Sequence, residues 1–358
     1  MLTDYFDSFL YNYAPYKSGA WCYEDGLIYR GLEVLYKATE DERYLEALRV
    51  RVDAKIDDDG HLRGYDPNDY NIDNVQSGRA LVALTKITGE QRYLDVASQL
   101  MRQLTHHPRT KSGVYWHKLR YPWQVWLDGL YMGPPFQISY AQATDQPDLI
   151  TDAITQISTA MEMTHNPQTA LYAHAVDEAR MQPWADPVTG QNPAHWSRAL
   201  GWLAMALVDV AELVGTKAFA PLEARTREFL TAIAAHRTPN GLWQQVFDQP
   251  DLNGNYEESS ASAMFTYALV KGIDLGLWDG NRDGLVQTLF DGVMKAKNGG
   301  GLEMVNMCHV AGLGLYEDRF RDGSAAYYIS EATCSDDAKG VGPLMMCQAL
   351  DLSAGVPR

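Results

Sequence analysis

The chain has 358 residues, of which 46% are hydrophobic, 21% charged and 11% aromatic, a composition typical of a soluble globular protein. The formal net charge of −16 at pH 7 argues against nucleic acids and anionic membrane surfaces as partners, because both are polyanions. The four cysteines show neither C-x-x-C spacing nor the density of a disulfide scaffold, which predicts reduced thiols.

The N-terminal segment lacks the basic stretch and the apolar core of a signal peptide. No uninterrupted run of apolar residues approaches the length of about 18 that indicates a transmembrane helix. We therefore expect a cytoplasmic protein that does not associate with membranes.

A loosely repeated helical unit recurs along the chain, and residues 31–48 align with residues 78–97. In both segments an amphipathic helix with apolar residues at i, i+3, i+4 and i+7 ends in a short polar turn. A second helix then begins at Arg-Tyr-Leu. Related helix pairs are predicted at 130–161, 196–236 and 260–297, and a last, shorter helix is predicted to start near Gly342.

Segments rich in Gly, Asp and Pro separate the helix pairs, at 57–71, 110–123, 166–193, 238–258 and 298–339. Turn signals such as Asp59-Gly60 and Asn240-Gly241 indicate loops or short hairpins. Six helical hairpins with long connections favour a closed ring, because the repeats of open solenoids are usually more regular. The predicted fold is all-α, an (α/α)6 barrel formed by a single domain over residues 1–358.

The expected position of a cleft follows from this ring. The first helix of each pair is the more apolar one and should form the inner wall, as at 78–88, 198–214 and 260–272. Loops that enter the inner helices would gather at one end of the ring. The predicted lining is therefore the set of polar and aromatic residues before these helices: Trp21, Tyr23, Asp73, Asn74, Asp128, Trp196, Arg198 and Glu258.

Asp128 is the one carboxylate in the stretch 126–136, Trp-Leu-Asp-Gly-Leu-Tyr-Met-Gly-Pro-Pro-Phe. An ionised, unpaired carboxylate is costly to bury, so we expect the pKa of Asp128 to be raised. A carboxyl that holds its proton near neutral pH can act as a general acid. The alternative is that Asp128 caps the helix that Pro134 and Pro135 would open.

Asp73 lies just ahead of a predicted helix, whose N-terminal amides favour an anion, so its pKa should stay low. Two carboxylates with pKa values pushed apart are typical of the acid/base site of a glycosidase. Alternatively, Asp73 or Asn74 is only a helix N-cap. His117 and His174 both follow turn signals beside aromatic residues, and each could equally be a structural, hydrogen-bonded histidine.

Arg198 falls in the first turn of a long apolar helix, where a cation opposes the helix dipole and needs a compensating anion. Arg198 and Trp202 are four residues apart on one helix face, so a guanidinium and a sugar-stacking ring can meet one ligand. This pattern indicates a ligand that carries a carboxylate. The sequence contains no P-loop, no dinucleotide-binding glycine motif, no nucleophile elbow and no His or Cys cluster with metal-binding spacing, so no metal site is predicted.

Three motifs occur in order along the chain: Trp126-Leu-Asp-Gly-Leu-Tyr-Met…Pro-Phe136, His195-Trp-Ser-Arg-Ala-Leu-Gly-Trp202 and Glu258-Ser-Ser-Ala-Ser-Ala-Met264. With these motifs, the chain resembles the unsaturated rhamnogalacturonyl hydrolases of glycoside hydrolase family 105, from about Trp21 to Met346. The resemblance implies an (α/α)6 barrel that acts on products of pectin lyases, small oligosaccharides that end in a 4,5-unsaturated uronic acid. In that family an aspartic acid protonates C4 of the vinyl ether, water adds at C5, and the resulting hemiketal opens.

By resemblance, Asp128 is the proton donor, and Asp73 and His174 are the catalytic residues beside it. The substrate-binding residues implied in the same way are His117, Trp196, Arg198, Trp202, Trp21 and Tyr23. The resemblance implies no organic cofactor and no metal. The partner is then a small oligosaccharide, bound by a monomer or a weak homo-oligomer.

The leaving sugar stays open, because Cys334-Ser-Asp-Asp-Ala-Lys-Gly-Val-Gly-Pro343 matches the usual Asn-Asp-x-His-Gly pattern only in part. One alternative is an unsaturated glucuronyl hydrolase of the related family 88, acting on glycosaminoglycan or other polyuronate fragments. A second is an isomerase like the N-acylglucosamine 2-epimerases, which would use paired histidines and leave the Asp128 stretch unexplained. A third is a non-catalytic sugar sensor, in which Asp128 would be dispensable.

Overall fold

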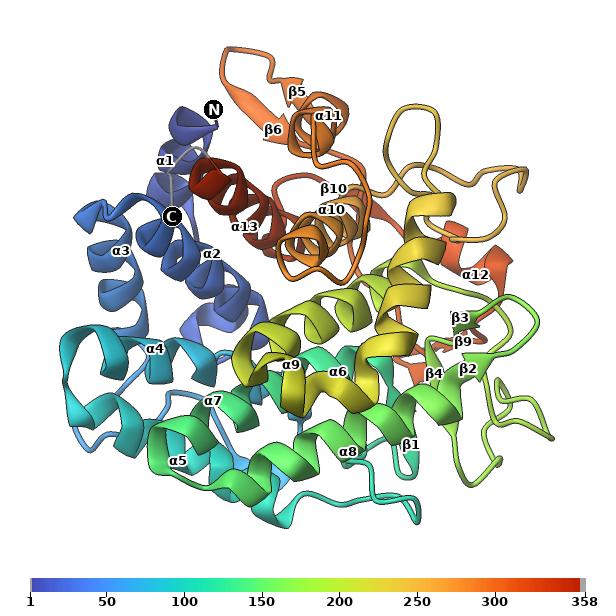
Figure 1. Ribbon diagram of the computed structural model, residues 1–358, viewed down its shortest axis with the longest axis horizontal. Helices are drawn as coiled ribbons and strands as arrows, with labels where there is room; N and C mark the ends of the chain where they lie inside the picture. Colours follow the sequence, from blue (N-terminus) through green and yellow to red (C-terminus); the bar gives the residue numbers. More distant parts are fainter. Residues whose placement is uncertain (1, 355–358) are drawn as a thin grey trace.

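Helices of the computed structural model, which describes residues 2–354, form an inner and an outer ring (Figure 1). The inner ring consists of α2 (Tyr23–Thr39), α4 (Gly78–Thr88), α7 (Pro134–Thr144), the first half of α9 (Ser197–Ala235), α10 (Ser259–Asp274) and α13 (Ala338–Ala354). The outer ring consists of α1 (Thr3–Asn12), α3 (Glu42–Asp53), α5 (Gln91–His106), α8 (Pro147–Thr164), the second half of α9 and α11 (Leu285–Val293).

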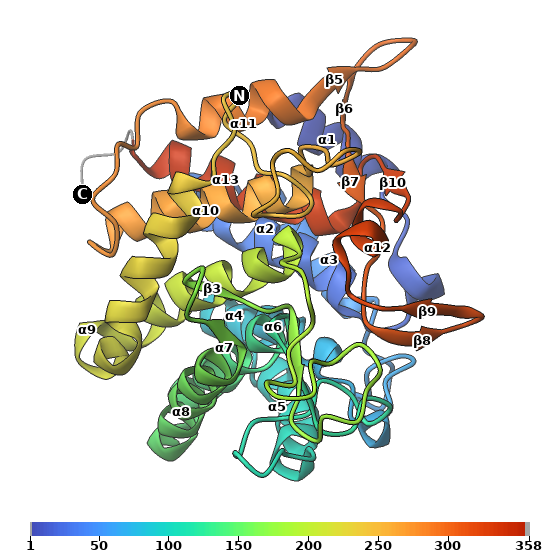
Figure 2. The same ribbon diagram turned by 90° about the vertical axis from the view of Figure 1, so that its right-hand side faces the viewer.

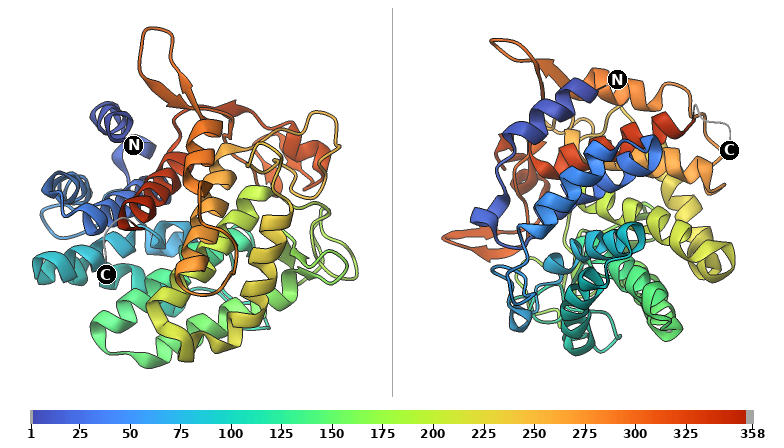
Figure 3. Two further views of the ribbon diagram at one scale, coloured as in Figure 1. Left: turned by 45° about the horizontal axis from the view of Figure 1, so that its top comes forward. Right: turned by 90° about the vertical axis from the view of Figure 1, so that its left-hand side faces the viewer.

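The inner ring is closed by α13, which packs along α2, so the first and last helical hairpins lie side by side (Figure 3). Glycines permit this close approach: a Cβ on Gly31 would lie 2.8 Å from the Cβ of Met345, and one on Gly342 would lie 2.7 Å from the carbonyl oxygen of Leu27. The closed ring confirms the predicted (α/α)6 barrel over the open solenoid. One main hydrophobic core runs through it, and the single-domain assignment for the whole chain stays a prediction.

Two helix boundaries differ from the sequence-based expectation. The last helix begins at Ala338 rather than near Gly342, and its outer partner is α1, which the sequence pattern did not reveal. The two helices join through contacts between opposite ends of the chain: the backbone amide of Leu2 donates to the side chain of Gln348 at 3.1 Å. Such pairing cannot be read from local periodicity.

The predicted pair at 196–236 is one continuous stretch, α9, that turns from the inner to the outer ring at Gly215. Gly215 has φ 72° and ψ 170°, a conformation that glycine adopts without a steric penalty. Within residues 2–354, α9 is the one helix whose length and hydropathy would allow a membrane span, and 72% of the 18-residue window that meets this test is buried inside the protein. Its place on the inner wall explains its apolar character, and the absence of membrane association stays a prediction.

Strands are restricted to short antiparallel pairs in the loops between helices. The pairs are β1 (Gln124–Trp126) with β4 (Ala175–Asp177), β2 (His165–Asn166) with β3 (Leu171–Tyr172), β5 (Met294–Ala296) with β6 (Leu302–Met304), β7 (Met307–Cys308) with β10 (Thr333–Cys334), and β8 (Gly314–Tyr316) with β9 (Arg319–Arg321). Two short helices complete the loops, α6 (Leu127–Met132) and α12 (Ala325–Ile329). The pair β1–β4 joins two loops that are about 50 residues apart in the chain, and the hairpin β8–β9 projects from the barrel (Figure 2).

Candidate active site

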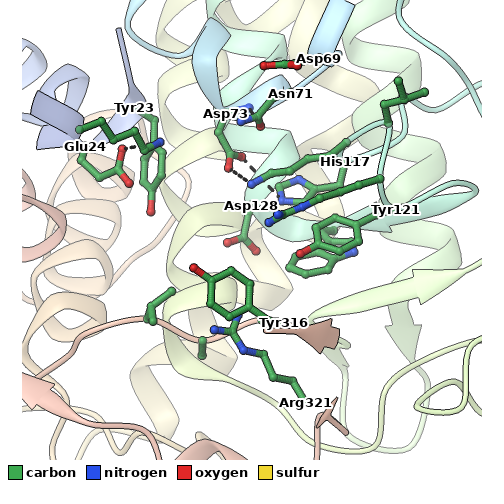
Figure 4. A pocket seen from close by; sticks show the side chains of 18 of the residues that line it. Tyr23, Glu24, Asp69, Asn71, Asp73, His117, Tyr121, Asp128, Tyr316 and Arg321 are labelled. Atoms are coloured by element: carbon green, nitrogen blue, oxygen red, sulfur yellow. Dashed lines mark hydrogen bonds and ion pairs between the residues drawn. The ribbon is translucent and has the colours of Figure 1, made fainter. Parts of the chain in front are cut away.

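A cavity of about 790 Å³ opens at the end of the barrel where the inner helices α2 and α4 begin (Figure 4). Its walls come from residues 17–24, 68–73, 117–128 and 310–321. Three of the predicted lining residues, Tyr23, Asp73 and Asp128, belong to these walls, as does His117. The expected cleft at the entrance to the inner helices is therefore present.

Asp128 lies in the first turn of α6, directly after β1. The strand pair β1–β4 positions its neighbour His174: Trp126 is opposite Ala175, and the amide of Leu127 donates to the carbonyl oxygen of His174 at 2.9 Å. Nε2 of His174 then lies 3.2 Å from Oδ2 of Asp128. The alternative role as a helix cap is excluded, because the N-cap of α7 is Gly133 and that of α6 is Trp126.

A buried polar chain orients the His174 ring. The hydroxyl of Tyr328 lies 2.8 Å from Nδ1 of His174 and accepts a hydrogen bond from the Asn192 amide at 3.3 Å. Since the amide supplies that proton, the phenol is free to donate its own to Nδ1. A neutral ring that accepts this bond at Nδ1 carries its proton on Nε2, 3.2 Å from Oδ2 of Asp128.

The predicted rise in the pKa of Asp128 is wrong. Burial does raise the pKa, but the imidazoles of His174 and His117 outweigh it and hold the pKa below its ordinary value. The carboxylate is also less enclosed than its apolar sequence context suggested, with 16% of the side chain exposed. The neighbouring imidazole and the open cavity both favour the ionised form.

Asp73 forms the second carboxylate of the cavity, in the short helical turn Ile72–Val75. Nζ of Lys118 lies 2.5 Å from its Oδ2, and Nε2 of His117 lies 3.7 Å from its Oδ1. Burial raises the pKa of Asp73, but Lys118 and His117 bring it below its ordinary value, which confirms the predicted low pKa. The side chain is not the N-cap, because Asn71 accepts the hydrogen bond from the amide of Asp73.

His117 is part of an aromatic wall beside both carboxylates. Its ring stacks on Trp126 with centroids 4.5 Å apart and an interplanar angle of 13°, and Tyr121 lies nearly parallel to both rings, 4.9 Å from Trp126 and 6.1 Å from His117. Burial lowers the pKa of His117 to about 4, so the ring is neutral at pH 7. A flat sugar ring can lie against such a surface.

Arg198, Trp196, Trp202 and Trp21 are buried behind the cavity walls. The Arg198 guanidinium donates to the backbone carbonyls of Cys308 and His309 and to the hydroxyl of Ser260, which in turn donates to the buried carboxylate of Glu258. It also lies 4.7 Å from the ring centroid of Trp196. Direct contact of these four residues with substrate stays a prediction.

The other buried residues of this set support the walls. The indole of Trp21 donates to the carbonyl oxygen of Asn74 at 2.7 Å, and Trp202 packs edge-on against Tyr23 with centroids 6.3 Å apart. Glu258 does not line the cleft as expected, because it is fully buried and caps α10 through the amides of Ser260 and Ala261.

Several cavity residues were missed in the sequence. Lys118 and Trp126 lie next to predicted residues, so their positions carried a usable signal. Tyr316 and Arg321, like the buried Tyr328 behind His174, come from the long segment 298–339, which has no helical periodicity to indicate its orientation. Within residues 2–354, no three His, Cys, Asp or Glu side chains come together to hold a metal ion, and the metal-free site stays a prediction.

Residues 5–351 match the model of Glycosyl Hydrolase Family 88. The chain belongs to this family. Membership in this family agrees with the hydrolase motifs in the sequence. It argues against the isomerase and the sugar sensor as alternatives.

Relatives extend this result. The unsaturated rhamnogalacturonyl hydrolase YesR of Bacillus subtilis is 27% identical over 314 residues, which cover 82% of this chain and 86% of YesR. Protein Atu3128 of Agrobacterium fabrum is 46% identical over 231 residues, 62% of this chain and 98% of that protein. The structure of a family 105 glycoside hydrolase from C. acetobutylicum superimposes with a TM-score of 0.87 at 35% identity, covering 94% of each chain. The enzyme is therefore a glycoside hydrolase with the six-hairpin fold.

Proposed function

We propose that the enzyme removes the terminal 4,5-unsaturated uronic acid from small oligosaccharides, with unsaturated rhamnogalacturonan fragments as the substrate. The observation that carries this proposal is the pairing of Asp128 with His174 opposite Asp73 and Lys118 in one cavity. One carboxylate is held as an anion by a lysine, and the other faces only an imidazole and open space. The resemblance to YesR supports rhamnogalacturonan fragments as the substrate.

Asp128 is the proton donor in this mechanism. Its carboxyl transfers a proton to C4 of the vinyl ether, and the π electrons of the C4–C5 double bond form the new C–H bond. The cation at C5 is stabilised by the ring oxygen and is attacked by water, while the Asp128 carboxylate takes up a proton from that water. The hemiketal opens to a ketone at C5, C1 collapses to an aldehyde, and the leaving sugar departs with one water consumed.

Because the pKa of Asp128 is low in the free enzyme, substrate binding must raise it before Asp128 can act as the acid. The uronate brings its own carboxylate close to Asp128 and displaces water, and both effects raise the pKa of Asp128. Asp128 then takes up its proton when the reacting atoms are in place. Nε2–H of His174 stabilises the carboxylate that remains after proton transfer.

The other walls position the ring. Lys118 holds Asp73 as a hydrogen-bond acceptor for sugar hydroxyls, and neutral His117 can donate or accept beside it. Trp126 and Tyr121 offer a flat apolar surface. No step needs a metal ion or an organic cofactor.

Replacement of Asp128 tests the proposal. We expect Asp128→Asn to lower the rate at which unsaturated rhamnogalacturonan disaccharide loses its vinyl-ether absorbance by about 10²–10⁴-fold, the typical contribution of a general acid. Asp148→Asn, on the outer helix α8, is the matched control and should retain the wild-type rate.

Each outcome decides a different part of the proposal. An equal rate in Asp128→Asn and the wild type would overturn the assignment of the acid. Loss of absorbance with a glycosaminoglycan disaccharide alone would overturn rhamnogalacturonan as the substrate. No loss with any unsaturated uronide would overturn the function itself.

A further inference from the structure

The shape of the cavity determines which end of the oligosaccharide lies at its bottom and which end lies at its mouth. The unsaturated ring is the end of its chain and must reach Asp128, of which only 16% is exposed. The rest of the oligosaccharide must therefore leave through the mouth. Residues at the mouth, such as Arg120 and Tyr316, are the exposed part of the cavity lining.

The hairpin β8–β9 contributes Tyr316 and Arg321 to the cavity lining. Gly314 pairs with Arg321 and Tyr316 with Arg319, so Tyr316 and Arg321 share one face of the hairpin, and both line the cavity (Figure 4). The opposite face carries Leu315 and Phe320, which are exposed. The hairpin thus presents a tyrosine and an arginine to whatever passes through the mouth.

Two guanidinium groups converge on the Tyr316 ring. The guanidinium carbon of Arg321 lies 4.1 Å from the ring centroid, and that of Arg120 lies 6.0 Å from it. Both arginines line the cavity, so an anion in this part of the mouth is attracted by two positive charges. Arginine is suited to that role because its planar fork binds a carboxylate through two hydrogen bonds.

These two arginines differ from the other cations of the cavity. Lys17 is paired with Glu24 at 3.4 Å and Lys118 with Asp73 at 2.5 Å. Within residues 2–354, by contrast, Arg120 makes no ion pair and no hydrogen bond.

Arg321 is only weakly neutralised. Its nearest carboxylate is Glu331, whose Oε1 is 3.9 Å from Nε, while the other oxygen of Glu331 accepts from Arg319 at 3.3 Å. The chain has a net charge of −16, yet two arginines without a close counter-ion lie at the mouth of the cavity. Their position favours an anionic ligand.

We propose that Arg120, Tyr316 and Arg321 form a subsite for a sugar carboxylate beyond the bond that is cleaved. This inference rests on the proposed function and adds that the enzyme prefers substrates with a second acidic group. That carboxylate can belong to the leaving sugar itself, as in an unsaturated diuronide. It can also belong to the sugar after a neutral leaving group, as in an unsaturated rhamnogalacturonan tetrasaccharide.

Comparison of three substrates tests the subsite: an unsaturated uronyl-rhamnose disaccharide, an unsaturated digalacturonide and an unsaturated rhamnogalacturonan tetrasaccharide. We expect kcat/KM of the wild type to be about tenfold higher for at least one acidic substrate than for the neutral-ended disaccharide, as for one charge-assisted hydrogen bond. Arg120→Met and Arg321→Lys should each reduce this ratio at least threefold. Arg49→Met, an exposed arginine on α3, is the control and should preserve the ratio.

The substrate that shows the preference identifies the source of the carboxylate. A preference for the digalacturonide places it on the leaving sugar, and a preference for the tetrasaccharide alone places it one sugar further. A wild-type ratio of one, or a ratio unchanged in both variants, would overturn the subsite.

Calorimetric binding of the same oligosaccharides to Asp128→Asn separates this inference from the proposed function. Tighter binding of an acidic oligosaccharide that is lost on adding Arg120→Met supports the subsite even if no substrate is turned over. Equal binding of all three oligosaccharides overturns it.

Discussion

Asp128 lies on the loop helix α6 and Asp209 on the inner helix α9, and the two acidic residues have different surroundings. Asp209 is fully buried near a second cavity of about 430 Å³, between the C-terminal halves of α2 and α4 and the helix α10. Its carboxylate pairs with Lys271 and Arg79, each at 2.8 Å, and with Arg30 at 3.8 Å. Asp128 has one imidazole at 3.2 Å and an open cavity.

The difference shows that partners, rather than burial alone, separate a structural carboxylate from a reactive one. Burial raises the pKa of Asp209, but Lys271, Arg79 and Arg30 hold the pKa far below its ordinary value, so the group does not exchange protons near neutral pH. Its cations come from three different inner helices, which ties the ring together at that end. Asp128 is also ionised, but one weak partner lets a bound substrate change its protonation.

The largest expected effect that tests this comparison concerns stability. We expect Asp209→Asn to lower the free energy of unfolding by about 3–5 kcal/mol, because it leaves buried cations without their counter-ion. Asp128→Asn should change it by no more than about 1 kcal/mol, because Asp128 faces one imidazole and an open cavity and neutralises no buried cluster of cations. Urea denaturation followed by circular dichroism measures both. Equal destabilisation by the two variants would contradict the division into structural and reactive carboxylates.

A smaller effect concerns the free energy of unfolding at acidic pH, to which His117 and the Asp209 cluster should contribute differently. Burial lowers the pKa of His117 to about 4, so between the ordinary value near 6.5 and 4 the unfolded chain binds a proton that the folded protein does not. The free energy of unfolding should therefore fall as the pH falls through this window, by roughly 2–3 kcal/mol for this residue. The Asp209 cluster should contribute little slope above about pH 5, because the ordinary pKa of an aspartate is about 4 and the unfolded chain binds few protons there.

His117→Gln should remove this slope in part, as measured by denaturation at pH 7 and pH 4.5. His107 is the matched control, since burial lowers its pKa to about 4 as well, but it lies outside the cavity. His107→Gln should reduce the slope by a similar amount and leave kcat/KM unchanged at pH 7. An unaltered slope in both variants would refute the assignment.

The smallest expected effect comes from replacing the lysine beside each structural or site carboxylate, Lys271 for Asp209 and Lys118 for Asp73. Lys118→Met should lower kcat/KM about tenfold, because Asp73 loses a charge-assisted hydrogen bond and its pKa rises. Lys271→Met should instead reduce stability and leave kcat/KM unchanged at a temperature where the variant is folded. Lys111→Met, an exposed neighbour of the site, controls for the loss of a positive charge. The reverse pattern would show that the far end of the barrel takes part in catalysis.

Much of the site was predictable where the relevant residues lie in local motifs. Asp128, His117 and Asp73 line the same cavity because each lies in a segment that leads to an inner helix, α7 for the first two and α4 for Asp73, and the apolar periodicity identified those helices. Lys118 and Trp126 could have been added from their positions beside His117 and Asp128. The Asp209 cluster escaped notice because its members are single charges on otherwise apolar helices, with no motif to connect them.

The prediction for Asp128 failed in one respect, and the reason is physical. A sequence shows which neighbours a carboxylate has along the chain, and those of Asp128 are apolar and aromatic. The pairing of β1 with β4 brings in His174 from a distant segment, and this imidazole lowers the pKa. Arg198 likewise donates hydrogen bonds to the carbonyls of Cys308 and His309. These carbonyls belong to a distant segment, and no local sequence pattern connects them to Arg198.

The sequence alone determined the ring of helical hairpins, the end at which the site lies and the pair of carboxylates in it, because periodicity and short motifs are local properties. The tertiary structure decided the protonation of Asp128, the direction of Arg198 and the entry of Tyr316 and Arg321 into the mouth. Each of these depends on through-space electrostatics between segments far apart in the chain, and the short strand pairs in the loops set those distances.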